Sequence, residues 1–155
     1  MGKHDAAIAE GERSVELAPN HADNAANLAC SYVVASRPAD AVVMMRKAMR
    51  LSPVFPTWYL SILGFGHYQR GEYAEAEAVL KQALEREPAF ADARLFLTLC
   101  YHARGLDAEA RREAAEVVRH NPKWTLKNFE TNLSIVKDRA MVAVAFATLR
   151  SLGLS

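Results

Sequence analysis

Five histidines and two cysteines are the residues best suited to metal binding or nucleophilic chemistry, and their spacing favours neither. No histidine has a second histidine or a cysteine three to five residues away, the spacing at which one helix presents two ligands to zinc. A Cys–His pair assembled only in the fold stays open, although no local signature supports it. The sequence therefore predicts no metal site, no cofactor and no catalytic residue. The residues concerned are His4, His21, His67, His102 and His120, with Cys30 and Cys100.

Sites for phosphate, nucleic acid or a membrane are also disfavoured. The Gly64-x-Gly66 pair lies in a predicted helix with no preceding strand, so it indicates close helix packing rather than a phosphate loop. Basic residues gather over 111–127, but 19 Lys+Arg against 18 Asp+Glu leave a net charge of only +1, too little to favour nucleic acid. The longest uncharged run, 51–69, contains two prolines, two glycines and several polar residues, so we expect no membrane span.

Composition and cysteine usage indicate an ordinary folded domain. Apolar residues make up 51% of the chain and charged residues 24%, which is enough to bury a core. Two cysteines in apolar stretches predict buried, reduced thiols that lie too far apart for a disulfide. No segment has the pattern of a secretory signal peptide. We therefore expect a reduced, cytoplasmic protein.

The elements that position these residues repeat along the chain. Prolines recur at spacings of 34, 35 and 34 residues, and an alanine stands twelve residues before each of them. Within one period, apolar residues recur at helical spacing on both sides of a glycine such as Gly71, which favours a turn between two helices. The second helix ends near the proline. The columns are Pro19, Pro53, Pro88 and Pro122, with Ala7, Ala41, Ala76 and Ala110.

Each period is therefore predicted to be a helical hairpin, too small to bury its own apolar face, so the hairpins must stack into an all-α solenoid. We expect a half repeat over 1–21 that supplies only a second helix, three repeats over 22–55, 56–89 and 90–122, and capping helices over 123–155. Without its first helix, the half repeat should leave Ile8, Val15 and Leu17 partly uncovered and invite homodimerisation through the N-terminal helix. In the cap, Thr125 is expected to start a helix towards Leu133, and Asp138 a last helix that ends before Gly153.

This pattern resembles the tetratricopeptide repeat, whose units carry Trp-x2-Leu-Gly-x2-Tyr, then Ala-x3-Phe, then Pro. The departures are His67 in a tyrosine column, Thr98 in a glycine column and Ala114 in the large apolar column. The resemblance implies a right-handed superhelix of antiparallel hairpins. The first unit matches at Leu28, Ala29, Tyr32, Ala41, Met45 and Pro53, the second at Leu63, Gly64, Ala76, Leu80 and Pro88, and the third at Leu97, Tyr101, Ala110 and Pro122.

The amino-acid sequence of several segments is similar to that of the C-terminal repeat region of bacterial class III adenylate cyclase-like proteins. The similar segments are Pro56–Leu60 with Leu63-Gly64, then Ala93–Leu97, and towards the end Asn121-Pro122, Lys137-Asp138 and Leu149–Leu154. It implies a parent protein with a cyclase domain elsewhere, since this all-helical chain offers no metal-binding aspartates on a mixed αβ domain.

In the tetratricopeptide family the first helix of each hairpin lines a concave groove, and the resemblance carries this to residues of all three first helices here, Cys30 among them. Six of these residues are predicted to bind a partner. Few of the groove columns are charged, so an apolar or amphipathic partner segment is expected rather than a terminal carboxylate. Trp58 and Phe65 have an alternative reading, in which they only pack against the next repeat or the cap. The predicted groove residues are Asn27, Trp58, Phe65, Tyr68, Phe96 and His102.

Two functions follow as hypotheses. The first is a non-catalytic protein–protein interaction module that holds a partner segment in its groove. The alternative is a regulatory or oligomerisation region of a larger bacterial adenylate cyclase-like protein, with the groove filled by the same polypeptide.

Overall fold

A computed structural model describes residues 2–155, and every regular element in that range is an α-helix. The all-α fold class predicted from the repeats is therefore confirmed. The nine helices of the described range are α1 (Lys3–Leu17), α2 (Ala22–Val34), α3 (Pro38–Leu51), α4 (Thr57–Gln69), α5 (Tyr73–Arg86), α6 (Ala91–Ala103), α7 (Asp107–His120), α8 (Leu126–Leu133) and α9 (Arg139–Ser151).

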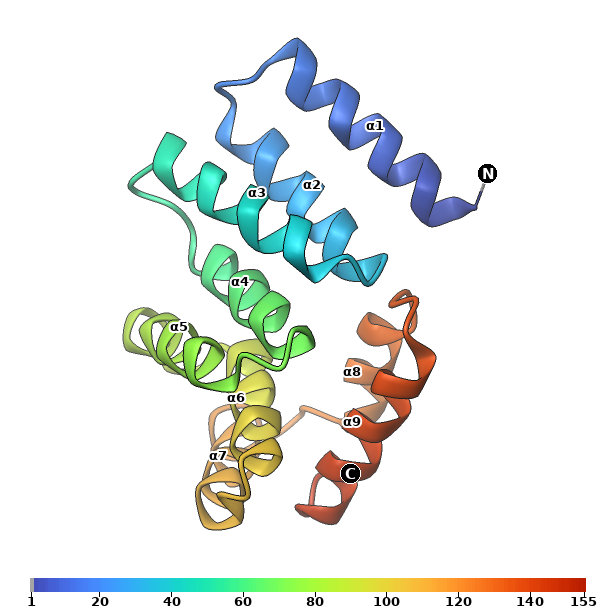
Figure 1. Ribbon diagram of the computed structural model, residues 1–155. Helices are drawn as coiled ribbons and strands as arrows, with labels where there is room; N and C mark the ends of the chain where they lie inside the picture. Colours follow the sequence, from blue (N-terminus) through green and yellow to red (C-terminus); the bar gives the residue numbers. More distant parts are fainter. Residues whose placement is uncertain (1) are drawn as a thin grey trace.

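Helix α1 and three successive hairpins form one stack (Figure 1). Helix α2 pairs with α3, α4 with α5, and α6 with α7, and the second helix of each pair also packs against the first helix of the next. We call α2, α4 and α6 the inner helices, and α1, α3, α5 and α7 the outer helices. Neighbouring inner helices contact one another, so together they form one continuous inner face.

The turns within the hairpins use a left-handed residue at equivalent positions. Gly71 and Gly105 have φ of 74° and 75°, as the break predicted at Gly71 requires. The first hairpin places Ser36 there, with φ of 58°. A residue with a Cβ pays roughly 1–2 kcal/mol for this conformation. The Ser36 hydroxyl also accepts a hydrogen bond from the backbone N–H of Asp138, at 3.0 Å.

Small residues set how closely the two helices of a hairpin approach. Ala41, Ala76 and Ala110 are 1%, 0% and 0% exposed. At Gly64 a Cβ would lie only 2.5 Å from the side chain of Leu80 on the paired outer helix. The glycine is thus required by close helix packing, as its place in the sequence predicted.

His67 fills the column in which the repeat pattern has tyrosine. Its ring is buried, with Nδ1 2.6 Å from a carboxylate oxygen of Glu72 and Nε2 3.4 Å from the guanidinium of Arg46. The hydrogen bond from His67 lowers the pKa of Glu72. The imidazole therefore joins the end of α4 to the start of α5 and to α3, a structural task within the second hairpin.

The C-terminal helices begin and end where the sequence predicted. The Thr125 hydroxyl accepts the N–H of Asn128, the Asp138 carboxylate accepts the N–H of Met141, and Gly153 follows α9 with φ of 99°. The two helices pack together, and the N–H of Leu126 donates to the carbonyl of Ser155 at 2.9 Å. We call α8, α9 and the loop between them the C-terminal hairpin.

The C-terminal hairpin lies beside the inner face instead of extending the stack beyond α7 (Figure 1). Helix α9 packs against α6, and the Phe129 ring lies 5.9 Å from that of Phe96. At the far end of the hairpin, the N–H of Lys137 donates to the carbonyl of Val34 at 2.8 Å. The hairpin therefore reaches from the third repeat back to the first.

The N-terminal helix differs in part from the prediction. Leu17 is 77% exposed and Val15 is half-buried, as expected, but Ile8 is only 6% exposed. Ile8 lies on the side of α1 that faces α2, the next helix in the stack, and α2 therefore covers it. Helix α4 covers Val42, the equivalent residue of α3, in the same way.

Gly64→Ala tests the packing of the second hairpin. The added methyl group must displace Leu80, so we expect the free energy of unfolding, measured by urea denaturation, to fall by about 1–3 kcal/mol. Helix propensity alone would raise it by about 1 kcal/mol. In a Leu80→Ala background the clash is gone, and Gly64→Ala should be neutral or stabilising. An equal loss in both backgrounds would contradict this contact.

Candidate functional site

The aromatic centre of the inner face is covered by the C-terminal hairpin. Phe65 and Phe96 stack with ring centroids 4.3 Å apart, and they are only 3% and 5% exposed. Phe129 lies against Phe96 and also 6.0 Å from Phe146 of α9. Phe65 and Phe96, which were predicted to line a partner-binding groove, form part of the core between the repeats and the hairpin and also line a cavity beneath it. For Phe65 this is the alternative internal packing that the sequence left open.

The other predicted groove residues lie in different surroundings. Tyr68 joins the Phe65–Phe96 cluster, is half-buried, and has its pKa raised to about 12 by burial. Trp58 is half-buried in a second cluster, where its ring meets that of Tyr59 edge-on at 4.5 Å. Asn27 and His102 are exposed.

The His102 side chain contacts a residue across the turn between α6 and α7. Its Nδ1 lies 2.9 Å from a carboxylate oxygen of Asp107 at the start of α7. The six predicted residues thus form one cluster of three, Phe65, Tyr68 and Phe96, and three separate positions.

Cavities lie at the first repeat, where α1 and the loop of the C-terminal hairpin approach the end of α2. Two adjoining cavities, of about 500 and 290 Å³, run between α1, the end of α2 and the loop of the C-terminal hairpin. A third, of about 240 Å³, continues beneath the hairpin to Phe65 and Phe96. Val34 and Ile135 line all three. We call the first two cavities the α1–α2 groove; its walls are Lys3, His4, Ala7, Cys30, Ser31, Val34, Ser134, Ile135, Val136, Lys137 and Arg139.

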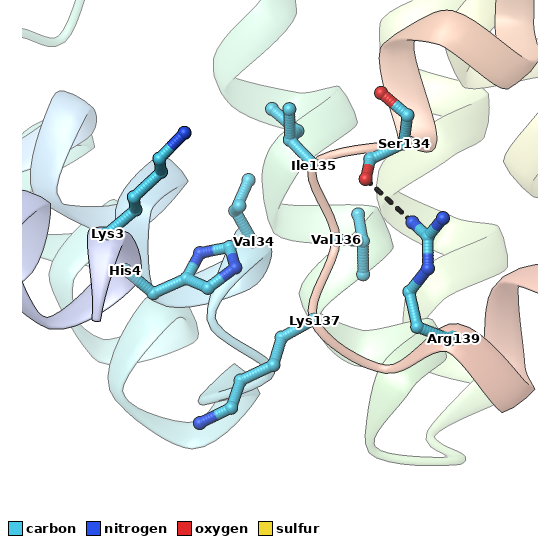
Figure 2. Close-up of a pocket in the computed structure, with 8 residues that line it drawn as sticks. All are labelled: Lys3, His4, Val34, Ser134, Ile135, Val136, Lys137 and Arg139. Carbon is cyan, nitrogen blue, oxygen red and sulfur yellow. Dashed lines mark hydrogen bonds between the residues drawn. The ribbon is translucent and has the colours of Figure 1, made fainter.

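This groove combines an apolar floor with a basic rim. Val34, Ile135 and Val136 lie at the centre of the larger cavity, and Figure 2 shows the His4 ring pointing towards Val34 and the loop. Lys3 lies on the α1 side and Lys137 on the loop side, while Nη1 of Arg139 donates to the carbonyl of Ser134 at 2.6 Å. Among the described residues that line the larger cavity, none is a carboxylate. Such a surface suits an apolar segment with acidic neighbours.

Both cysteines are free thiols, and burial weakens them as nucleophiles. Burial raises the pKa of Cys30 from 9.0 to about 11 and that of Cys100 to about 12, so both are protonated near neutral pH. Cys100 is fully buried as expected, but Cys30 is only half-buried because it lines the α1–α2 groove.

Sequence reasoning missed most of this groove. Its loop wall, 134–137, carries no motif, and the only signals near it were the helix starts at Thr125 and Asp138. These signals locate a loop but say nothing of what the loop contacts. The basic rim also escaped notice, because Lys3, Lys137 and Arg139 come from the two ends of the sequence.

Comparisons with known proteins agree with this architecture. A tetratricopeptide repeat family model matches residues 67–127. The crystal structure of MamA superposes with a TM-score of 0.71 at 20% identity, covering 97% of this chain and 89% of that one. The fold is that of a tetratricopeptide-repeat domain. No curated protein matches the sequence.

Two further structures of tetratricopeptide-repeat proteins are similar to this domain. TTC0263, a thermophilic protein of Thermus thermophilus, gives a TM-score of 0.69 at 24% identity, covering 93% of this chain and 73% of that one. YrrB, described as having an unusual peptide-binding site, gives 0.64 at 19% identity, covering 97% and 78%. At these identities the likeness shows the fold alone. None of the three structures bears on the resemblance to cyclase-like proteins, which stays a hypothesis.

Within residues 2–155, no group of three or more His, Cys, Asp or Glu side chains is placed to hold a metal ion. No helix in that range combines the length and the apolar character needed to cross a bilayer.

The thiol of Cys30 should react slowly although it faces a cavity. A pKa near 11 rather than 9.0 leaves about 100-fold less thiolate near pH 8, so modification by iodoacetamide should be slower by about that factor than in the urea-unfolded chain. The rate should rise with pH towards the pKa. A Cys100→Ala variant isolates the signal, which is read by mass spectrometry. A folded-state rate equal to that of the unfolded chain would refute the raised pKa.

Proposed function

We propose that this tetratricopeptide-repeat domain is a non-catalytic protein–protein interaction module that binds an apolar or amphipathic segment of a partner protein in the α1–α2 groove. The observation that carries the proposal is a set of three cavities that share Val34 and Ile135 as lining residues, where α1, the end of α2 and the loop of the C-terminal hairpin meet. Repeat proteins of this kind use such concave surfaces for binding.

The physical properties of the groove support binding. Ile135 is 59% exposed on the groove wall, although an aliphatic side chain of that size gains about 1.5–3 kcal/mol when it is buried. The wall is held by the hydrogen bond from the N–H of Lys137 to the carbonyl of Val34 at the end of α2, and by the bond from the N–H of Asp138 to the Ser36 hydroxyl. The groove is therefore preformed, and a partner orders little of it. Peptide binding described for YrrB, a protein of the same fold, is consistent with this assignment.

The predicted aromatic groove keeps a reduced role in this proposal. Phe65 and Phe96 support the C-terminal hairpin and meet a partner only through the cavity beneath it. Asn27 and His102 are exposed and available at the edges of the inner face, and Trp58 and Tyr68 are each half-exposed. Contacts at these four positions remain part of the proposal as peripheral contacts.

One observation favours the alternative function. The inner face is largely filled by the chain's own hairpin, as expected if the array holds its own polypeptide rather than a separate ligand. In that reading the domain is a regulatory or oligomerisation region of a larger adenylate cyclase-like protein. A concentration-dependent oligomer, seen by sedimentation velocity and insensitive to groove substitutions, would favour this alternative.

Ile135→Asp tests the interaction module. Because this side chain is largely exposed, the variant should keep its helical circular dichroism. A carboxylate on the apolar wall of the groove should lower partner capture from lysate at least tenfold. The matched control is Val54→Asp, at a 94% exposed valine between α3 and α4 that lines none of the three cavities. Captured partners are quantified by mass spectrometry. If a Trp58→Ala/Tyr68→Ala variant lost the partner while Ile135→Asp retained it, the α1–α2 groove would be the wrong site.

A further inference from the structure

We infer that the cavity beneath the C-terminal hairpin receives the ammonium group of a lysine of the partner segment and pairs it with Asp92. The inference rests on the proposed function and names one side chain that the partner must carry. The cavity, of about 240 Å³, is formed by α2, α4, α6 and the C-terminal hairpin, and no described residue of α1 lines it. We call it the inner cavity; its wall includes Cys30, Ser61, Phe65, Asp92, Phe96 and Asn132.

The inner cavity is largely apolar and has one charged position. Phenylalanine rings and aliphatic side chains make up most of its wall. Asp92, on the first turn of α6, is the one charged side chain among the described residues that line it. A carboxylate in such surroundings is costly unless it is paired. The wall therefore favours a group that is apolar along most of its length and carries one positive charge.

The Asp92 carboxylate has no partner in residues 2–155. The equivalent residue of the first repeat, Asp23, accepts a hydrogen bond from the Tyr59 hydroxyl at 2.9 Å. No side chain of the described range pairs with Asp92, and burial raises the pKa of its carboxyl above the ordinary value. A cation beside this carboxylate would offset the cost of burying its charge.

The polar groups of the inner cavity lie on one side of its aromatic pair. Asp92 precedes Phe96 by four residues on α6, so the two side chains share a face of that helix. Ser61, which is buried, precedes Phe65 by four residues on α4. The two helices run in the same direction because α5 returns between them, and the Phe65 and Phe96 rings stack 4.3 Å apart. Asp92 and Ser61 therefore lie about one helical turn from the stacked rings.

A lysine side chain matches this order of groups. Its methylene stem suits the apolar wall, and the faces of the aromatic rings attract the cation at its end. The ammonium group is a compact donor of three hydrogen bonds, and Asp92, Ser61 and Asn132 each offer an oxygen acceptor. The guanidinium of arginine is planar, has five donors and follows a shorter stem, so it suits this wall less well.

The size and the opening of the inner cavity favour a side chain over a whole small molecule. Sites for small molecules commonly have about 300–1,000 Å³, more than the 240 Å³ of this cavity. Two of its lining residues, Asn132 and Ile135, are exposed, and Ile135 also lines the α1–α2 groove. A segment bound in that groove can therefore direct one side chain into the inner cavity.

A nuclear magnetic resonance titration with n-butylammonium tests the site, because this ion reproduces the lysine side chain from Cβ outward. We expect it to shift the resonances of Ile62 and Val136, which line the inner cavity, and to bind about tenfold more tightly than neutral 1-butanol. With Asp92→Asn the two compounds should bind equally. The matched control is Asp23→Asn, at the same column of the first repeat, which lines none of the three cavities and should have no effect. Circular dichroism should show that both variants stay folded.

Cross-linking with a carbodiimide tests whether the ammonium group comes from a partner protein. The reagent joins a carboxyl group to an amine in contact with it, forming an amide while the carbodiimide takes up the water as a urea. In the complex captured from lysate, the tryptic peptide 87–94 should be joined through Asp92 to a lysine of the partner. Fragmentation in the mass spectrometer distinguishes Asp92 from Glu87 in this peptide. Asp92→Asn should abolish the cross-link and lower capture about tenfold.

Several outcomes would overturn the inference. One is equal binding of n-butylammonium to the native chain and to Asp92→Asn. Another is tighter binding of n-propylguanidinium, which reproduces the arginine side chain and would make arginine the occupant. A cross-link from Asp92 to a lysine of a second copy of this chain would make that copy the occupant.

The same experiments separate this inference from the proposed function. If Ile135→Asp lowers capture while Asp92→Asn changes neither capture nor n-butylammonium binding, the interaction module stands and the lysine site is wrong. If n-butylammonium binds through Asp92 but no partner is captured, the proposed function fails and a free amine replaces the partner lysine. Capture that depends on both residues, with the cross-link at Asp92, supports both.

Discussion

The structure depends on one constraint: a single helical hairpin cannot bury its own apolar face. Each outer helix must lie against two inner helices, one from its own hairpin and one from the next. Within the stack this requirement is met, and the alanine columns are fully buried. The C-terminal hairpin covers much of the inner face. On α1, Ala7 is exposed, although the equivalent alanines of α3, α5 and α7 are buried.

Features encoded by neighbouring residues could be predicted from the sequence. The repeat period, the turn at Gly71, and the helix starts at Thr125 and Asp138 each depend on contacts within a few positions. The close approach at Gly64 was also predictable, because a glycine inside an apolar helix commonly marks a tight contact. These features fixed the order of the helices and the class of the fold.

The course of the C-terminal hairpin could not be predicted in the same way. Apolar residues such as Phe65 and Phe96 show that a face of the helix must be covered. A separate partner protein and a later segment of the same chain could cover it equally well, and the pattern does not distinguish them. What distinguishes them here includes a backbone hydrogen bond from Lys137 to Val34, which any residue pair could make.

The C-terminal hairpin, which follows the last repeat, also forms part of the groove at the first repeat. The loop wall of the α1–α2 groove exists only because the C-terminal hairpin crosses the inner face and is held at the end of α2. Ser36 contributes to this attachment: its left-handed backbone has an energetic cost, yet its hydroxyl accepts the N–H of Asp138. The aromatic cluster of Phe65, Phe96 and Phe129 anchors the other end of the same hairpin. Phe65 and Phe96, which the sequence assigned to a partner, thus support the hairpin whose loop forms one wall of the α1–α2 groove.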